Sequence, residues 1–83
     1  MATTTKTSVR SLREIAREIR REWKNVNFGA EPYLNAMAQL DSIDDNYMFD
    51  SGKTIVLYFL GNASSWRGES ARRIKAELKK MTK

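Results

Sequence analysis

The chain has 83 residues, a net charge of +5, and neither cysteine nor histidine. A chain of this length forms one domain with a modest core, which excludes an active-site cleft walled by several layers. Without cysteine there is no disulfide framework and no thiolate metal site, so packing alone must hold the fold, as is usual for cytoplasmic domains. No apolar stretch approaches the roughly 18 residues of a membrane span, and we expect neither a targeting signal nor a membrane partner.

The charges follow one another in three blocks. Residues 1–24 hold seven basic and three acidic residues, residues 25–52 hold five acidic and no basic residues, and residues 53–83 hold eight basic and two acidic residues. This basic, acidic, basic order predicts a bipolar surface rather than a uniformly cationic one.

The first predicted element is an amphipathic helix over residues 8–25. Its apolar residues recur at alternating steps of three and four, namely Val9, Leu12, Ala16, Ile19, Trp23 and Val26, and Ile15 widens the stripe. At about 100° per residue, one flank collects Arg10, Arg13, Arg17, Arg20, Arg21 and Lys24, and the other collects Glu14, Glu18 and Glu22. We expect Arg10 to pair with Glu14 and Glu18 with Arg21. The outer arginines are then free, either as a solvated helix face or as an electrostatic contact surface.

A second helix and an acidic loop are expected next. Proline suits the first turn of a helix, and Tyr33, Leu34, Met37 and Leu40 follow at helical spacing, so a helix is predicted over residues 32–41. Residues 41–50 then form an ordered loop in which the acids Asp41, Asp44, Asp45 and Asp50 surround the apolar residues Ile43, Tyr47, Met48 and Phe49. The acids do not have the spacing of an EF-hand, so we expect no metal and no cofactor.

The run Thr-Ile-Val-Leu-Tyr-Phe-Leu at residues 54–60 is the ambiguous element. By propensity alone it is a strand, but no other segment offers an alternating run with which a strand could pair. We therefore predict a helix over residues 53–61, capped by Asp50 or Ser51 and ended by Gly61 in the left-handed conformation. Since it is apolar on every side, it is expected at the centre of the fold. The residues Ser-Gly-Lys-Thr at 51–54 match the tail of a phosphate-binding P-loop, but the leading glycine of that motif is absent.

The last predicted helix follows residues 62–65, with Ser64 or Ser65 as its cap and Trp66 in its first turn. Its buried stripe consists of Ala71, Ile74, Leu78 and Met81, and most of its remaining circumference is basic, with Arg72, Arg73, Lys75, Lys79, Lys80 and Lys83. These cations either complement the helix dipole and hydrate the surface, or form a binding surface. Trp23 and Trp66 are expected to be core anchors.

Three stretches resemble a known family: Glu-Trp-Lys-Asn-Val at residues 22–26, Gly-Ala-Glu-Pro-Tyr-Leu at 29–34 and, above all, residues 51–68, which end in Asn-Ala-Ser-Ser-Trp-Arg-Gly. From about residue 9 onward the chain is similar to small uncharacterised proteins encoded by bacteriophages, prophages and mobile elements of Gram-positive bacteria. The resemblance implies a phage or mobile-element origin and the cytoplasm of a bacterial host, without an assigned activity. The residues themselves predict a tight joint between the last two helices, where Gly61 and Gly68 permit close backbone approach and Trp66 fills the corner.

Together these elements predict an all-α fold. We expect a compact bundle of about four short helices with a central apolar helix, in one domain over residues 8–83, preceded by a disordered tail at residues 1–7. The chain lacks the commonest general base and the most reactive nucleophile, so we expect neither an enzyme nor a small-molecule substrate.

Two binding functions remain. The first is a helical module that binds a host or phage protein, and the second is a basic protein whose first and last helices contact nucleic-acid phosphates. A protein partner is favoured, because the acidic middle of the chain would repel nucleic acid. Homodimerisation through the first helix is a third alternative, although that helix is short for a coiled coil. The candidate binding residues are Arg10, Arg13, Arg17, Arg20, Arg21, Lys24, Arg72, Arg73, Lys75, Lys79 and Lys80.

Overall fold

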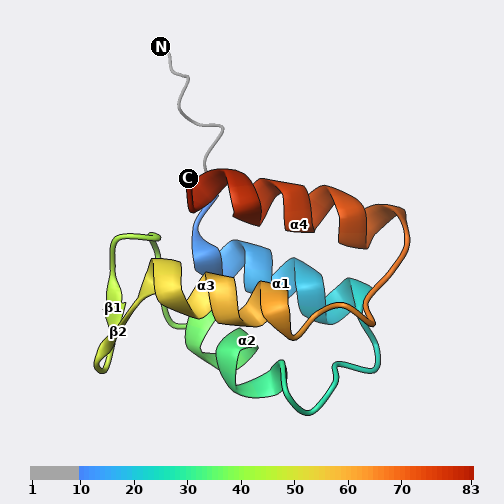
Figure 1. Ribbon diagram of the computed structural model, residues 1–83, viewed down its shortest axis with the longest axis horizontal. Coiled ribbons are helices and arrows are strands. Elements are labelled where there is room, and N and C mark those ends of the chain that lie inside the picture. Colours follow the sequence, from blue (N-terminus) through green and yellow to red (C-terminus); the bar gives the residue numbers. More distant parts are fainter. Residues whose placement is uncertain (1–9) are drawn as a thin grey trace.

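The computed structural model describes residues 10–83, which form four helices and one short β-hairpin (Figure 1). In chain order these are α1 (Leu12–Glu22), α2 (Glu31–Met37), β1 (Asn46–Tyr47), β2 (Asp50–Ser51), α3 (Gly52–Gly61) and α4 (Glu69–Met81). The prediction of a mostly helical fold with about four helices is confirmed, and the hairpin is an addition to it. The predicted tail at residues 1–7 and residues 8 and 9 of the first predicted helix lie outside the described residues. Arg10 and Ser11 are described and precede α1, so that helix begins later than predicted.

The start of α1 is fixed by a reciprocal N-cap and by backbone hydrogen bonds to the segment that follows α2. The Ser11 hydroxyl accepts a hydrogen bond from the Glu14 N–H at 3.1 Å, and the Glu14 carboxylate accepts one from the Ser11 N–H at 3.1 Å. The next N–H groups, of Leu12 and Arg13, donate to the carbonyls of residues 41 and 40. α1 ends at Glu22, earlier than predicted, because the residue after it has an extended backbone.

The core lies between two pairs of helices. α1 packs against α2 and α4, and α3 packs against the same two helices (Figure 1). The buried apolar residues come from all four, and the largest that are fully buried are Leu12, Ile15, Ile19, Leu34, Met37, Val56, Phe59, Ile74 and Leu78. From Leu12 onward, the apolar stripes predicted for α1 and α4 face this core, which confirms their helical periodicity, and Val9 lies outside the described residues.

The ambiguous run at residues 54–60 is helical, as predicted by elimination, and Ser51 caps it by accepting a hydrogen bond from the Thr54 N–H at 3.2 Å. The prediction that this helix is enclosed on every side is wrong. Ile55, Val56 and Phe59 are buried, but 48% of Leu57 and 52% of Tyr58 is exposed. Each helix of a domain this small keeps one face toward solvent, and the other three helices do not cover the outer face of α3.

The acidic segment before α3 is a hairpin rather than an irregular loop. β1 and β2 pair antiparallel, with Asn46 opposite Ser51 and Tyr47 opposite Asp50, which leaves residues 48 and 49 as a two-residue turn. Ile43 and Tyr47 pack against the core, as expected, but Met48 and Phe49 lie in solvent, so the prediction is wrong for these two. Gly52 follows the hairpin, where a Cβ atom would come within 2.8 Å of the Ile43 carbonyl oxygen.

The joint between α3 and α4 differs from the prediction at both glycines. Trp66 is buried there, but a Cβ atom on Gly61 or Gly68 would meet no atom within 4 Å, so neither glycine permits a close approach. Gly61 is a helical residue of α3, and the left-handed conformation expected for it is absent. Gly68 has a φ of 111° and is the N-cap of α4. α4 therefore begins at Glu69, after the predicted Ser64 or Ser65 cap and after Trp66.

Candidate binding surface

The basic residues of α1 are divided between internal ion pairs and solvent. Arg13 pairs with Asp41 at 2.8 Å, and Arg20 pairs with Glu31 at 3.3 Å. The expected pairs of Arg10 with Glu14 and of Glu18 with Arg21 are not formed; Arg10 pairs instead with Glu18 and Glu77, and Glu18 pairs with Arg10 and Arg73. Among the residues that the structure describes, no acid forms an ion pair with Arg17, Arg21 or Lys24.

Two arginines tie α1 to α4. Glu18 accepts hydrogen bonds from Arg73 at 2.6 Å and from Arg10 at 2.7 Å, and Arg10 also donates to both carboxylate oxygens of Glu77 at 3.0 and 2.7 Å. The hydrogen bonds from Arg73 and then Arg10 hold the pKa of Glu18 below its ordinary value. The hydrogen bond to Glu77 is the main cause that raises the pKa of Arg10. Arg10 and Arg73 are therefore engaged within the fold.

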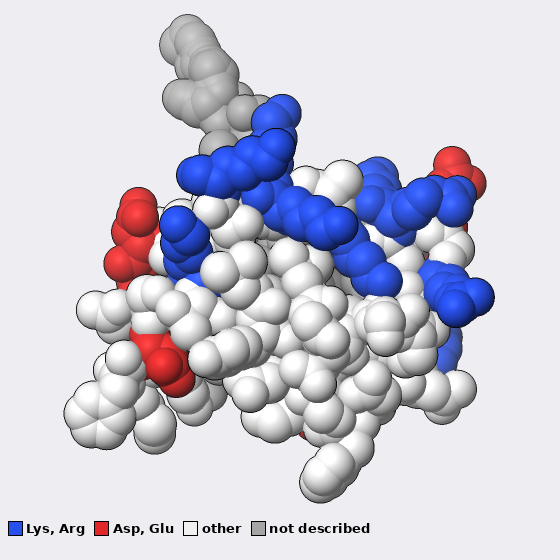
Figure 2. Space-filling model, viewed as in Figure 1, with Lys and Arg blue, Asp and Glu red and all other residues white. Residues whose placement is uncertain are grey.

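Among residues 10–83, no acid forms an ion pair with the cations on the opposite flank of α4. Lys75 donates a hydrogen bond from its Nζ atom to the Trp66 carbonyl at 2.7 Å, so its side chain lies along the connection before α4. Burial lowers the pKa of Lys75, and the nearby cations of Lys79 and Arg67 lower it further. Figure 2 shows the Lys and Arg side chains as a band over α4.

Three open hollows lie at the end of the molecule where α1 ends and the α3–α4 connection passes. The first, of about 570 Å³, has Trp23, Lys24 and Phe28 among its lining residues. The second, of about 450 Å³, shares Trp23 and Lys24 with the first and adds Trp66 and Arg67. The third, of about 220 Å³, shares the latter two and adds Arg72 and Lys75. Because each hollow shares residues with the next, they form one surface.

We call this surface the cationic end and define it by Lys24, Arg67, Arg72 and Lys75. No acid within the described range 10–83 forms an ion pair with any of the four. The hollows meet at two tryptophan rings that are stacked at 5.4 Å with 9° between their planes. Phe59 packs edge-on against one of them, with its ring centroid 6.2 Å from that of Trp23. The cations therefore surround a rigid aromatic support.

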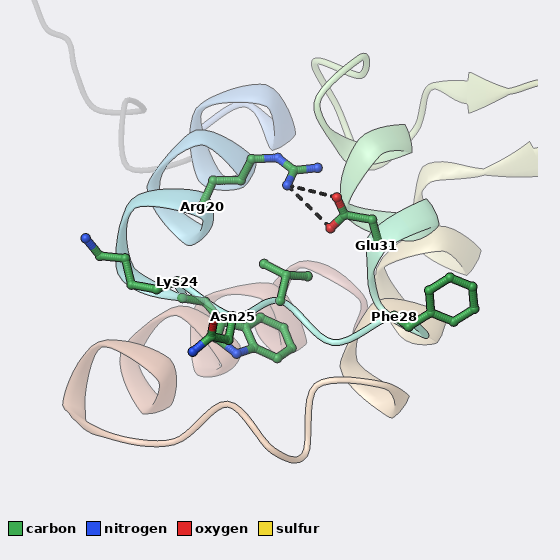
Figure 3. Close-up of a pocket in the computed structure, with 7 residues that line it drawn as sticks. Arg20, Lys24, Asn25, Phe28 and Glu31 are labelled. Atoms are coloured by element: carbon green, nitrogen blue, oxygen red, sulfur yellow. Dashed lines mark hydrogen bonds and ion pairs between the residues drawn. The ribbon is translucent and has the colours of Figure 1, made fainter.

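The first hollow shows how one cation is neutralised and another is left free (Figure 3). The Arg20 and Glu31 side chains point toward each other across α1 and α2 and form the ion pair described above. Lys24 extends away from this pair, and the ring of Phe28, 95% exposed, points away from the centre of the hollow. Of the two cations that line this hollow, Lys24 is therefore the one that forms no ion pair within residues 10–83.

The structure sorts the eleven candidate residues into three groups. Four form internal ion pairs, namely Arg10, Arg13, Arg20 and Arg73. Three belong to the cationic end, namely Lys24, Arg72 and Lys75. The remaining four, Arg17, Arg21, Lys79 and Lys80, are exposed outside it. Sequence reasoning missed Arg67, because it lies in the connection between helices, where no periodicity marks a face.

Two features are absent among residues 10–83, a group of metal-ligating side chains and a membrane-spanning helix. Between residues 10 and 83, no three acidic, histidine or cysteine side chains gather as metal ligands would. None of the helices in that range has both the length and the apolar character that crossing a bilayer requires.

No family model, curated protein or solved structure matches this chain. Its function therefore has to be inferred from the chemistry of the surface.

Proposed function

We propose that this protein is a non-catalytic helical binding module whose cationic end takes an acidic segment of a protein partner. One observation carries the proposal: four cations that form no ion pair within residues 10–83 line three connected hollows around a stacked pair of tryptophans. Guanidinium groups such as those of Arg67 and Arg72 bind carboxylates through two parallel hydrogen bonds. The hollows beside them can receive the apolar side chains of the same segment.

A protein segment suits this surface better than a nucleic-acid backbone does. Phosphate binding along two helices needs an unbroken row of free cations, but Arg13 and Arg20 of α1 are held in ion pairs. Two of the hollows are also lined by a glutamate, Glu22 in one and Glu31 in the other. Such mixed and partly apolar surfaces are typical of protein interfaces. The alternative of a nucleic-acid-binding protein that contacts phosphates through its first and last helices is retained as an outcome of the test.

The setting of this interaction follows from the resemblance to proteins of bacteriophages, prophages and mobile elements. On that basis we place the partner among the cytoplasmic proteins of a Gram-positive host or of the phage itself. The search for the partner therefore starts with those host and phage proteins.

The proposal is tested by selecting peptides from a random display library on the immobilised protein. We expect the selected peptides to combine Asp or Glu with aromatic or aliphatic residues. A selected peptide should bind the double variant Arg67→Glu, Arg72→Glu at least roughly tenfold more weakly than the wild type. The matched control Lys80→Glu reverses an exposed charge of α4 outside the cationic end and should bind the peptide as the wild type does.

Two results would contradict this function. One is selection of peptides without an excess of acidic residues. The other is a gel shift of nonspecific duplex DNA that weakens steeply between about 50 and 200 mM salt and is lost in the same double variant, which would establish nucleic acid as the ligand.

A further inference from the structure

The β-hairpin ends in two large apolar residues that almost fully face solvent. Met48 is 81% exposed and Phe49 is 103% exposed. Met48 also has a φ of 58°, in the left-handed region that side chains other than Asn and Gly rarely adopt. Only the first of the two turn residues has a positive φ, and glycine is the usual occupant of that position, where it is less strained. An exposed apolar pair held in a strained turn is typical of a contact site.

The base of the hairpin is firmly anchored. The Asp45 carboxylate accepts hydrogen bonds from the N–H groups of Asp41 and Ser42 at 3.2 and 3.1 Å, and the Asp45 carbonyl accepts one from the Gly52 N–H at 2.7 Å. Tyr47 packs against the core. The apolar tip is thus presented on a fixed support, which lowers the entropy lost when it binds.

Three aspartates lie in or next to the hairpin: Asp50 in β2, and Asp44 and Asp45 just before β1. Asp44, Asp45 and Asp50 are exposed, and none of them forms an ion pair with a residue between 10 and 83. Figure 2 shows acidic side chains gathered at the hairpin end of the molecule, apart from a patch beside the start of α4. We call the two apolar residues of the turn and these three aspartates the acidic knob.

The acidic knob and the cationic end lie at opposite ends of the long axis. In Figure 1 the hairpin projects at one end, while the C-terminus of α1 and the connection between α3 and α4 lie at the other. The two surfaces of one molecule therefore do not meet each other. Their chemistry is nevertheless complementary, since one carries carboxylates near an exposed phenyl ring and the other carries cations around open hollows, and none of these charges forms an ion pair within residues 10–83.

We infer that the acidic knob of one molecule docks in the cationic end of a second copy. The inference rests on the proposed function, because it supplies the acidic segment from the chain itself. The aspartates meet Lys24, Arg67, Arg72 and Lys75, and the ring of Phe49 enters a hollow beside Trp23 and Trp66. This contact is head-to-tail, so each added copy leaves one knob and one cationic end free. Assembly then continues as an open chain or closes as a ring.

Sedimentation velocity on the full chain tests this contact. The average mass of the wild type should rise with protein concentration at low salt and fall as salt screens the charges. Replacing the apolar pair, as Met48→Ser with Phe49→Ser, should weaken association at least roughly thirtyfold, as expected for the loss of a central aromatic anchor. Arg67→Glu with Arg72→Glu should have a similar effect. Leu57→Ser, which removes an exposed apolar residue from α3 instead, is the matched control and should associate as the wild type does.

Mixing the two defective proteins gives the decisive result. Each should be a monomer alone, but the knob variant keeps an intact cationic end and the charge-reversed variant keeps an intact knob. An equimolar mixture should therefore form a dimer and no larger species, because the remaining two surfaces are both defective. Absence of that dimer at concentrations where the wild type associates would overturn the inference, and so would a wild type that is monomeric at every concentration. Circular dichroism confirms that the variants are folded.

The wild type and the two variants also distinguish a failure of this inference from a failure of the proposed function. If the selected peptide binds the wild type and the knob variant equally but the wild type does not self-associate, the cationic end serves another protein and the inference fails. If the mixed dimer forms while no acidic peptide is selected, the cationic end serves self-assembly, and the proposed partner is wrong.

Discussion

Replacement of Gly68 by alanine should destabilise the protein, whereas the same replacement at Gly61, seven positions earlier, should not. Gly68 has φ 111° and ψ −179°, a region that is essentially restricted to glycine. Forcing a Cβ atom into it costs about 1–3 kcal/mol, although the space around it is open. Gly61 lies in α3 with an ordinary helical backbone and equally open space. Alanine there restricts the unfolded chain and should stabilise the protein by about 0.4–1 kcal/mol.

Urea unfolding followed by circular dichroism measures both effects. A shift of the midpoint at constant slope gives the change in the free energy of unfolding. In thermal unfolding, each kcal/mol corresponds to about 4–8 °C for a domain of this size. An unchanged midpoint for Gly68→Ala would refute the conformation described for the start of α4. A loss of stability for Gly61→Ala would instead support the close backbone approach that the sequence predicted and the structure lacks.

Three further predictions concern the core, a helix cap and acid stability. Trp66→Ala should lower the free energy of unfolding by about 3–5 kcal/mol, since it removes a buried ring from the joint between α3 and α4; a loss below about 1 kcal/mol in urea would contradict this. Ser11→Ala should cost about 1 kcal/mol in the same assay, whereas Ser11→Thr should leave stability nearly unchanged, and equal losses would exclude the cap. Because Arg73 and Arg10 lower the pKa of Glu18, its stabilising contribution is complete above its ordinary pKa of 4.5 and is lost as the pH falls through the lower folded pKa. Glu18→Gln should therefore be less stable than the wild type at neutral pH, with the difference shrinking in acid; a constant difference would argue against the network.

Much of the helical framework was predictable from local patterns. The stripe of α1 recurs at helical spacing, and Ser11 with Glu14 forms a cap that depends on residues only three positions apart. The helix over residues 54–60 followed from the absence of a strand partner rather than from propensity. The basic, acidic, basic order of charges agrees in part with the structure, since cations gather over α4 and acidic side chains at the hairpin end (Figure 2).

Other local patterns misled, for identifiable reasons. Gly61 follows an apolar helical run, as a left-handed terminating residue often does, but the cap is Asn62 and the positive φ falls at Gly68. Met48 and Phe49 were expected to pin a loop, because large apolar residues are usually buried. The short hairpin instead turns both toward solvent. Their apolar character between aspartates was the one local signal that could have marked them as a contact site.

By itself, the sequence determined which segments form helices and which face of α1 and α4 is buried, because both depend on the 3.6-residue period and on neighbours within one turn. Only the tertiary structure decided which cations are free. Arg10 meets Glu77, 67 positions away, and Arg67 joins Lys24 across the tryptophan stack. Ion pairing across elements depends on which helices pack together and at what rotation, and no local pattern encodes that arrangement.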